Sequence, residues 1–392
     1  MTLRVAIIGG GIGGLSAALA LLRQGFDVQV YEQAARFGEI GAGIQISPNA
    51  SRLLYRYGLA AEMDRYGVRP RAVHQKRWDN AATLQRALLG PEVEARFGAP
   101  YFHFHRGDLA ALLANAIPSE RTHAGHRLVE LDETGDRIVA RFDNGASAEA
   151  DLLIGADGIH SRVRHLVFGP ERPRFTGCVA WRGLVPAERI AHLDIEVASH
   201  NWMGPGAHCV HYWVSAGRFM NVVCVVEHGA WTSESWTDKG RVEDVLALYE
   251  GWHPTVRGLI SAFPETFIWA LHDRLPLPRW SEGRVTLLGD ACHPMLPMMA
   301  QGAAQAIEDG AALAVLLKTM PDDVPAALRR YETVRKPRAT RLQEASAANR
   351  VRFHFPDGPE QQKRDAAMAI SGDRSFDNIA WLYEHDAAEA RP

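Results

Sequence analysis

Cysteine and basic charge are both scarce in this sequence, and each shortage excludes a class of protein. Only 4 cysteines occur in 392 residues, and they show no paired spacing: Cys178, Cys209, Cys224 and Cys292. This pattern argues against a disulfide framework and against a zinc site, so we expect no metal ion and reduced thiols in a cytoplasmic protein. The formal net charge of −3 supplies no overall basic field, so nucleic acid is not expected as a partner.

Long hydrophobic runs are equally scarce. The one stretch that could suggest a membrane span runs without a charge from Val5 to Leu22, but several glycines interrupt it. It divides into a strand-like piece, a glycine turn and a helix-like piece, whereas a spanning helix needs about 20 predominantly apolar residues. We therefore expect no membrane association.

The N-terminal stretch predicts a strand–helix–strand unit. Leu3–Ile8 has the apolar character of a buried strand, and Asp27–Tyr31 has the alternation of a second one. The helix between them should end near Gln24-Gly25, where glycine can cap it. This order of elements is the one that binds dinucleotides.

The turn between the first strand and the helix carries Gly9, Gly11 and Gly14 in G-x-G-x-x-G spacing. The first glycine permits a tight turn, the second lets the backbone approach a pyrophosphate, and the third lets helix and strand pack closely. The helix N-terminus adds free N–H groups and a positive dipole end. Glu32 ends the second strand, where an acidic side chain can hydrogen-bond ribose hydroxyls. The unit predicts nucleotide binding without separating NAD from FAD.

Two further signatures follow. Gly155–Arg164 contains Asp157-Gly158 after a short strand, and Gly289–Pro294 begins with a Gly-Asp pair. The three signatures, in this order, resemble the single-component FAD-dependent aromatic hydroxylases typified by p-hydroxybenzoate hydroxylase, and the resemblance covers nearly the whole chain. It implies FAD, held non-covalently, as cofactor, NADH or NADPH as co-substrate, and O2 and a small aromatic acid as substrates. It leaves a homodimer open.

The resemblance also implies roles for individual residues. Asp157 and Gly158 would support the FAD pyrophosphate and affect pyridine nucleotide binding. Asp290 would bind the ribityl chain, and Pro294 would pass beside the isoalloxazine ring. Gly302 would open a helix whose N-terminus faces the pyrimidine end of the flavin and stabilises negative charge there.

Basic residues of two kinds need an interpretation. Arg106 matches a family position that contacts FAD, although pairing with an acid is the alternative. A second group lies together on one expected helix, and we interpret it as a solvated face, with a subunit contact or a pyridine nucleotide contact as the alternatives: Arg329, Arg330, Arg335, Lys336, Arg338 and Arg341.

The expected fold class is α/β, a Rossmann-like FAD-binding domain with an inserted antiparallel β-sheet substrate domain and C-terminal helices. Alternating β-branched and aromatic residues, as in Cys209–Val214, predict the inserted sheet. Helices are expected from about Ala303 to Lys318 and from Pro325 to about Arg350, the latter kinked near Pro337. The expected divisions are 1–173 for the first part of the FAD-binding domain, with 68–102 contributing to the substrate side, 174–267 for the substrate domain, 268–350 for the second part of the FAD-binding domain, and 351–392 for a helical tail.

The resemblance implies oxygen transfer from a flavin hydroperoxide to an electron-rich ring. A phenol becomes more nucleophilic as it loses its proton, so the protein needs a base near the substrate and a dry pocket. His208 is our candidate base, because Gly206–Tyr212 resembles a strand of salicylate, 3-hydroxybenzoate and 6-hydroxynicotinate hydroxylases in which a histidine faces the substrate. Tyr212 matches a residue that helps to shape the site in the last group, and alternation puts it on the same strand face as His208. A core histidine and a carboxylate-binding group are the alternatives for His208.

Two departures bear on the substrate. Gln45 stands where the 6-hydroxynicotinate enzymes carry histidine, and Pro297 stands where a 3-hydroxybenzoate 6-hydroxylase carries a functional glutamine. By elimination, we expect salicylate to be converted to catechol with loss of CO2, and we keep 3-hydroxybenzoate 6-hydroxylation and 6-hydroxynicotinate 3-hydroxylation as alternatives.

Other classes of flavoprotein also stay open. The sequence has no Trp-x-Trp-x-Ile-Pro signature of a halogenase and no redox pair of cysteines. A different FAD-dependent oxidoreductase or a non-catalytic flavin-binding protein would share the fold. The complete flavin-facing segment Gly289–Gly302 favours an enzyme.

Overall fold

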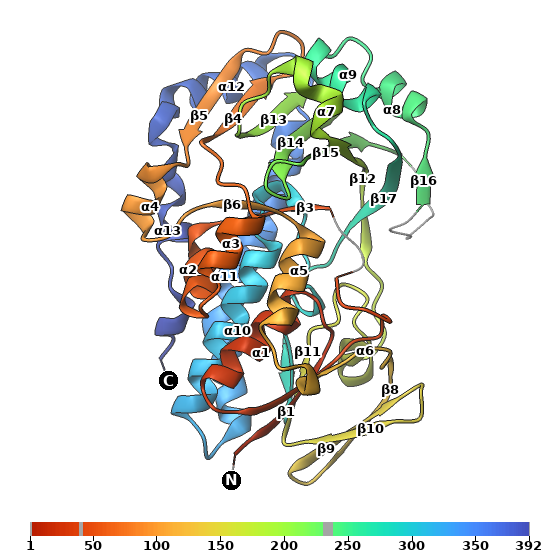
Figure 1. Cartoon of the computed structure of the whole chain (residues 1–392), viewed down its shortest axis with the longest axis vertical. Coiled ribbons are helices and arrows are strands. Elements are labelled where there is room, and N and C mark those ends of the chain that lie inside the picture. Colours follow the sequence, from red (N-terminus) through yellow and green to blue (C-terminus); the bar gives the residue numbers. More distant parts are fainter. Residues whose placement is uncertain (1, 39–41, 230–237, 392) are drawn as a thin grey trace.

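A mainly parallel sheet forms the first layer of the computed structural model, which describes residues 2–38, 42–229 and 238–391 (Figure 1). β1 (Arg4–Ile8) pairs in parallel with β2 (Asp27–Tyr31) and with β11 (Leu152–Gly155). The full strand order is β18-β19-β11-β1-β2-β7. The remaining strands are β7 (Thr122–His123), β18 (Ser281–Glu282) and β19 (Val285–Leu287). Since α1 (Ile12–Arg23) connects β1 to β2, the predicted strand–helix–strand unit is confirmed.

Helices pack against this sheet because its central strands are apolar on both faces. α1 is buried along most of its length and lies against α10 (Gly302–Thr319). A Cβ on Gly310 of α10 would lie 2.7 Å from the Ala17 Cα, so this glycine lets the two helix backbones approach closely. α11 (Val324–Phe353) covers α10 in turn.

An eight-stranded sheet forms the other large layer, in the upper half of Figure 1. Its order is β16-β17-β12-β15-β14-β13-β4-β5, and all neighbours are antiparallel except β13 and β4. Its strands are β4 (Ala72–Arg77), β5 (Thr83–Leu88), β12 (Arg174–Pro186), β13 (Ser199–Gly204), β14 (Ala207–Val214), β15 (Phe219–Glu227), β16 (Asp238–Gly240) and β17 (Thr266–Asp273). The expected mixed α/β architecture is therefore confirmed.

Smaller elements join and cover the two layers. The remaining strands are β3 (Gly43–Ile46) with β6 (Phe102–His105), and β8 (Leu128–Thr134), β9 (Arg137–Phe142) and β10 (Ser147–Ala150). The remaining helices are α2 (Pro48–Arg56), α3 (Ala60–Tyr66), α4 (Pro91–Phe97), α5 (Arg106–Asn115), α6 (Arg162–Phe168), α7 (Ala187–Ile190), α8 (Val242–Leu248), α9 (Pro254–Ser261), α12 (Pro359–Ser371) and α13 (Ala380–Tyr383). β3 and β6 pair at the level between the two large sheets, so they bring residues of the first layer towards the second (Figure 1).

Two expectations about the long C-terminal helix need correction. α11 continues to Phe353, beyond the expected end near Arg350. The interpretation of its basic residues as one solvated face is wrong for Arg335, whose side chain is fully buried against the acids of α10.

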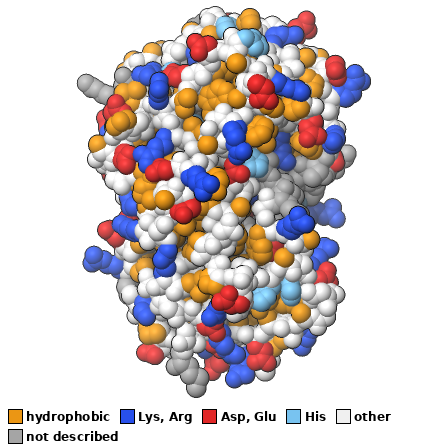
Figure 2. All heavy atoms as spheres, in the orientation of Figure 1, with side chains coloured by type: hydrophobic (Ala, Val, Ile, Leu, Met, Phe, Trp, Pro, Cys, Tyr) orange, Lys and Arg blue, Asp and Glu red, His pale blue; other side chains and the backbone are white. Residues whose placement is uncertain are grey.

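Surface charge and helix hydrophobicity bear on the expected partners. Figure 2 shows acidic and basic side chains interspersed over the viewed face. Among the described helices, none has the length and apolar character that crossing a membrane requires. The uncharged run that begins at Val5 is divided between β1, a turn and α1.

Candidate active site

The glycine turn after β1 leaves open space at the start of α1. Gly9 has φ +112°, and a Cβ on it would lie 2.3 Å from the Ala156 carbonyl oxygen. A Cβ on Gly14 would lie 1.9 Å from the carbonyl oxygen of Gly9, so packing demands both glycines. A Cβ on Gly11 would meet nothing within 4 Å. The space at Gly11 and the free N–H groups of the helix N-terminus fit a pyrophosphate.

Glu32 is fixed beside this turn. Its Oε2 accepts a hydrogen bond from the Gly10 N–H at 2.6 Å, and its Oε1 accepts one from the Ala34 N–H at 2.8 Å. An ionised carboxylate has about four acceptor sites, so two remain for the hydroxyls of a ribose. The position fits the nucleotide end of FAD, and the ribose contact stays a prediction.

The turn after β11 is organised by Asp157. Its Oδ1 accepts from the Ser161 hydroxyl at 2.5 Å, and its Oδ2 accepts from the N–H groups of Arg162 (2.6 Å) and Val163 (3.0 Å) at the start of α6. Burial raises the pKa of Asp157, and these hydrogen bonds oppose that rise. Gly158 has φ +77° and open space around it. Because the carboxylate is used by α6, the predicted support of the pyrophosphate would come from the backbone of this turn.

Three predicted FAD residues converge at the third signature. Asp290 is exposed to solvent, and the protein around it raises its pKa, whereas the charges of His293 and Arg106 oppose the rise. Arg106 begins α5 and is exposed. Gly302 begins α10, as predicted, and a Cβ on it would lie 3.8 Å from Asp290 Oδ1. A carboxylate, a cation and a helix N-terminus that lie close together fit the hydroxyl chain and the anionic edge of a reduced flavin.

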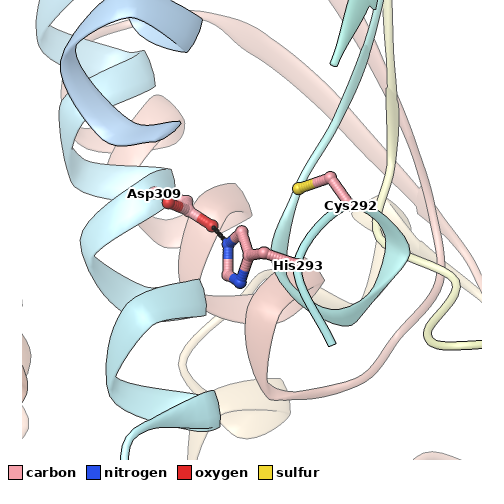
Figure 3. A group of neighbouring side chains, drawn as sticks. All are labelled: Cys292, His293 and Asp309. Carbon is pink, nitrogen blue, oxygen red and sulfur yellow. Dashed lines mark hydrogen bonds and ion pairs between the residues drawn. The ribbon is translucent and has the colours of Figure 1, made fainter. Parts of the chain in front are cut away.

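A buried hydrogen-bonded cluster holds this loop in place (Figure 3). His293 Nε2 lies 2.5 Å from Asp309 Oδ2, and the same oxygen accepts from the Gly289 N–H at 3.0 Å. Ligand atoms of Cys292, His293 and Asp309 all lie within 4.8 Å of one another. However, the Arg335 guanidinium contacts Asp309 at 2.7 Å and the thiol donates to the Gly289 carbonyl. We therefore interpret the cluster as an anchor of the loop, in which a cation is already supplied by arginine.

The next residue of the loop is fixed from α11. The buried Pro294 accepts a hydrogen bond on its carbonyl oxygen from Gln343 Nε2 at 3.0 Å. This contact ties the segment expected beside the isoalloxazine ring to the long helix.

The side chain of His208 lies on one face of β14, and the hydrophobic core that packs under α8 and α9 lies on the other face. It is 3% exposed, it pairs across the sheet with Met203 and Val225, and its ring lies against Phe353. Its Nδ1 lies 2.6 Å from Nε2 of His354. Burial first, and His354 second, lower the pKa of His208 well below its usual value, so the imidazole is neutral and able to accept a proton at neutral pH.

Tyr212 lies on the same face of β14, about 13 Å further along the strand at 3.4 Å per residue. Its ring centroid is 4.5 Å from that of His103, and its hydroxyl hydrogen-bonds to Gln45. Tyr101 donates to Gln45 Oε1 at 2.7 Å. Gln45 and His103 are directly opposed on β3 and β6, so four polar or aromatic side chains meet at one point.

His103 is the polar group that sequence reasoning missed. It is 0% exposed, burial and the nearby His200 lower its pKa to about 3, and neither ring nitrogen has a partner among the described residues. A buried imidazole without hydrogen bonds is costly, so His103 is an unsatisfied polar position in the interior beside Gln45 and Tyr212. The pairing of β3 with β6 places His103 opposite Gln45, and no local sequence signal predicts that strand pairing.

Asp290→Ala is expected to weaken FAD retention or slow flavin reduction while the fold persists. Hydrogen bonds to a charged group contribute about 1.5–3 kcal/mol, so FAD binding should weaken by roughly 10- to 100-fold. Equilibrium dialysis of FAD and stopped-flow reduction would measure this. Asp322→Ala, at an exposed acid beyond α10, is the control. Normal FAD content together with normal turnover in Asp290→Ala would contradict the assignment.

Comparisons with known proteins agree with this geometry. Residues 2–346 match the family described as FAD binding domain. The chain is 41% identical to 3-amino-4-hydroxybenzoate 2-monooxygenase from Streptomyces platensis, covering 98% of this chain and 96% of that protein. It is 41% identical to 6-hydroxynicotinate 3-monooxygenase from Bordetella bronchiseptica, covering 88% and 91%, and 36% identical to 3-hydroxybenzoate 6-hydroxylase from Klebsiella oxytoca, covering 99% of both.

Solved structures show the same architecture. Klebsiella pneumoniae HpxO complexed with FAD and uric acid superimposes with a TM-score of 0.86 at 29% identity, covering 97% of this chain and 96% of that one. A salicylate hydroxylase substrate complex superimposes with a TM-score of 0.83 at 26% identity, covering 100% and 99%. The chain therefore belongs to the FAD binding domain family, and within it to the flavin-dependent monooxygenases of aromatic rings, with FAD as cofactor and a reduced pyridine nucleotide as co-substrate.

Proposed function

We propose that the protein hydroxylates a small aromatic acid whose ring carries a hydroxyl or amino group, with 3-amino-4-hydroxybenzoate as the first candidate. The observation that carries this choice is the buried His103, whose two ring nitrogens lack partners beside Gln45 and Tyr212. A neutral imidazole can donate one hydrogen bond and accept another. The carboxylate and amino substituents of the ring would supply one partner of each kind, which leaves the hydroxyl for the other end of the site.

The names of the relatives support the same substrate class. Each reaction is named for a ring position next to, or opposite, a group that donates electrons: position 2 beside the 3-amino group, position 3 opposite the 6-hydroxyl, and position 6 opposite the 3-hydroxyl. Salicylate, the substrate expected from elimination, has support from a structure at 26% identity. The relatives at 41% and 36% identity that are named for 6-hydroxynicotinate and 3-hydroxybenzoate favour the two alternatives. The relative named for 3-amino-4-hydroxybenzoate adds a substrate that the sequence analysis did not consider.

The protein's own part in the reaction is to bind, orient and deprotonate the ring. Bound FAD would supply the redox chemistry that activates O2, which is the source of the oxygen atom. We assign the base to His208, because it is buried and neutral and its Nδ1 is held by His354. Its strand partners Met203 and Val225 cluster with Leu296 and Met298 of the segment expected to face the flavin. Tyr212, Gln45 and His103 would hold the carboxylate and amino substituents, at the end of the ring away from His208. Burial of all these groups excludes water from the reacting oxygen.

Reduced thiols support a place in the cytoplasm. All four cysteines are free and buried, as a reducing compartment would keep them. We propose the cytoplasm as the site of action on this ground.

The proposal is tested by oxygen uptake and NADH or NADPH oxidation with a panel of acids. The panel contains 3-amino-4-hydroxybenzoate, 6-hydroxynicotinate, 3-hydroxybenzoate and salicylate, and products are identified by mass. We expect coupled hydroxylation of 3-amino-4-hydroxybenzoate. Coupled formation of catechol and CO2 from salicylate alone would overturn this choice, and coupled turnover of none of the four acids would overturn the substrate class.

A further inference from the structure

The surroundings of His208 extend in a chain to the protein surface. His208 Nδ1 lies 2.6 Å from His354 Nε2, and His354 Nδ1 lies 3.2 Å from Glu227 Oε1. The side chains of His208 and His354 are buried, whereas that of Glu227 is 55% exposed. Three groups that can each accept and donate a proton therefore connect the interior with solvent in two short steps.

Each member of this chain comes from a different element. His208 lies on β14, Glu227 ends β15, and His354 follows the last residue of α11. The backbone holds the alignment, because the Gly206 N–H donates to the His354 carbonyl at 3.0 Å and the Glu227 N–H donates to the Gly206 carbonyl at 2.8 Å. These backbone hydrogen bonds position the two imidazoles next to each other, and they do not use either ring.

We propose that His354 and Glu227 form a proton relay that carries the substrate's hydroxyl proton from His208 to solvent. This inference rests on the proposed role of His208 as base. The substrate O–H gives its proton to His208 Nε2, His208 Nδ1–H passes a proton to His354 Nε2, and His354 Nδ1–H passes one to the Glu227 carboxylate. The products are a phenolate and a protonated Glu227, which then releases its proton to water. The charge is balanced at each step.

Burial explains why a relay is needed. A proton held on His208 would place a positive charge in the interior without compensation, and burial penalises that state. The charges around His354 partly cancel, so His354 would pass a proton on and would not retain it. Burial lowers its pKa, Glu227 raises it, and Arg350 lowers it from one turn back on the same helix. Arg350 is itself held by the Thr176 carbonyl at 2.6 Å, and it also interacts with Cys178, a buried thiol whose pKa burial raises.

Proton release on substrate binding tests the relay without flavin reduction. The oxidised FAD-bound enzyme is mixed with 3-amino-4-hydroxybenzoate in weak buffer with a pH indicator, and phenolate formation is followed by absorbance in the same experiment. In wild type, phenolate and a free proton should appear together. His354→Gln should slow both by about 100-fold, the lower end of what general acid–base catalysis contributes.

Glu227→Gln keeps the hydrogen bond to His354 but cannot take the proton. Glu227→Gln should slow both proton release and phenolate formation. Imidazole buffer should restore the rate of phenolate formation, as followed by absorbance, and a merely structural role of Glu227 would not produce this rescue. Because Glu227 is exposed, Glu227→Gln should fold, and it can test the relay even if His354→Gln does not fold. Glu243→Gln, an exposed acid on α8 with a side chain 71% exposed, is the matched control and should behave as wild type.

The outcomes separate the relay from the base. If His208→Gln abolishes phenolate formation while Glu227→Gln keeps the wild-type rate without buffer dependence, the relay is overturned and the base stands. If His208→Gln forms phenolate at the wild-type rate, both fail. If wild type binds none of the four panel acids, the proposed substrate class fails, and 3-hydroxyphenylacetate serves as the phenolic probe for the relay.

Discussion

NADH should still be consumed by a His208→Ala enzyme while hydroxylated product falls sharply. Reduction of FAD does not need loss of the hydroxyl proton of the substrate, but that loss favours attack on activated oxygen by a ring carbon ortho or para to the hydroxyl, as at position 3 of 6-hydroxynicotinate and position 6 of 3-hydroxybenzoate. Loss of a general base typically slows such a step by about 10²–10⁴-fold. The oxygen would then leave as hydrogen peroxide. Since burial and His354 keep the pKa of His208 well below its usual value, the effect should be present throughout the neutral pH range.

Product per NADH and peroxide per NADH measure this uncoupling. His208→Gln is the partner variant, because it keeps most of the side-chain volume at a fully packed position. His211→Gln is the control, since that ring is also buried on β14 but bonds to Trp202 on the opposite face. An unchanged ratio of product to NADH in both His208 variants would remove His208 from the role of base.

Local signals predicted the cofactor side of the molecule well. β2 has the limits expected from its alternation, and α10 begins at the predicted Gly302. These features depend on residues close in sequence: a turn needs glycine at a given position, and a strand needs a period of two. The fold follows because the three signatures lie at the ends of strands that neighbour one another in one sheet.

The substrate side could not be predicted to the same depth, because its contacts join distant segments. His208 and His354 are far apart in sequence, and they meet only because α11 continues beyond its expected end. His103 reaches Gln45 through the pairing of two short strands. Neither pairing leaves a periodic trace, so the sequence alone shows a histidine without showing its partner.

Arg335 shows the same limit on α11. Its sequence neighbours are mostly basic, which favoured a solvated face. In the fold its guanidinium lies 2.5 Å from Glu308 and 2.7 Å from Asp309, and all three side chains are 0% exposed. Charge in the sequence therefore did not report exposure, because the compensating acids belong to another helix.

Arg335→Met should be the most destabilising of the substitutions considered. Removing one partner of a buried ion pair leaves an uncompensated charge and typically costs about 3–5 kcal/mol. Arg338 would still contact Glu308 at 2.8 Å, but Asp309 would keep only His293 and the Gly289 N–H. The loop that carries Asp290 is anchored on Asp309, so FAD retention should fall together with stability.

The stabilisation from these carboxylates should also depend on pH in a defined direction. Burial alone would raise the pKa of Asp309, but His293 and Arg335 outweigh it and lower the pKa to about 2. A carboxyl group with a pKa lowered by folding stabilises the protein above its unfolded pKa of about 4, and that contribution disappears as the pH falls towards the folded value.

Urea unfolding of the FAD-bound enzyme between neutral and acid pH would show a steeper loss of the free energy of unfolding in wild type than in Arg335→Met. Arg329→Met, at an exposed position of the same helix, is the control, and Arg335→Met/Asp309→Asn should recover part of the loss because it removes the stranded charge. Wild-type stability and FAD content in Arg335→Met would show that the buried ion pairs neither stabilise the fold nor hold the flavin loop.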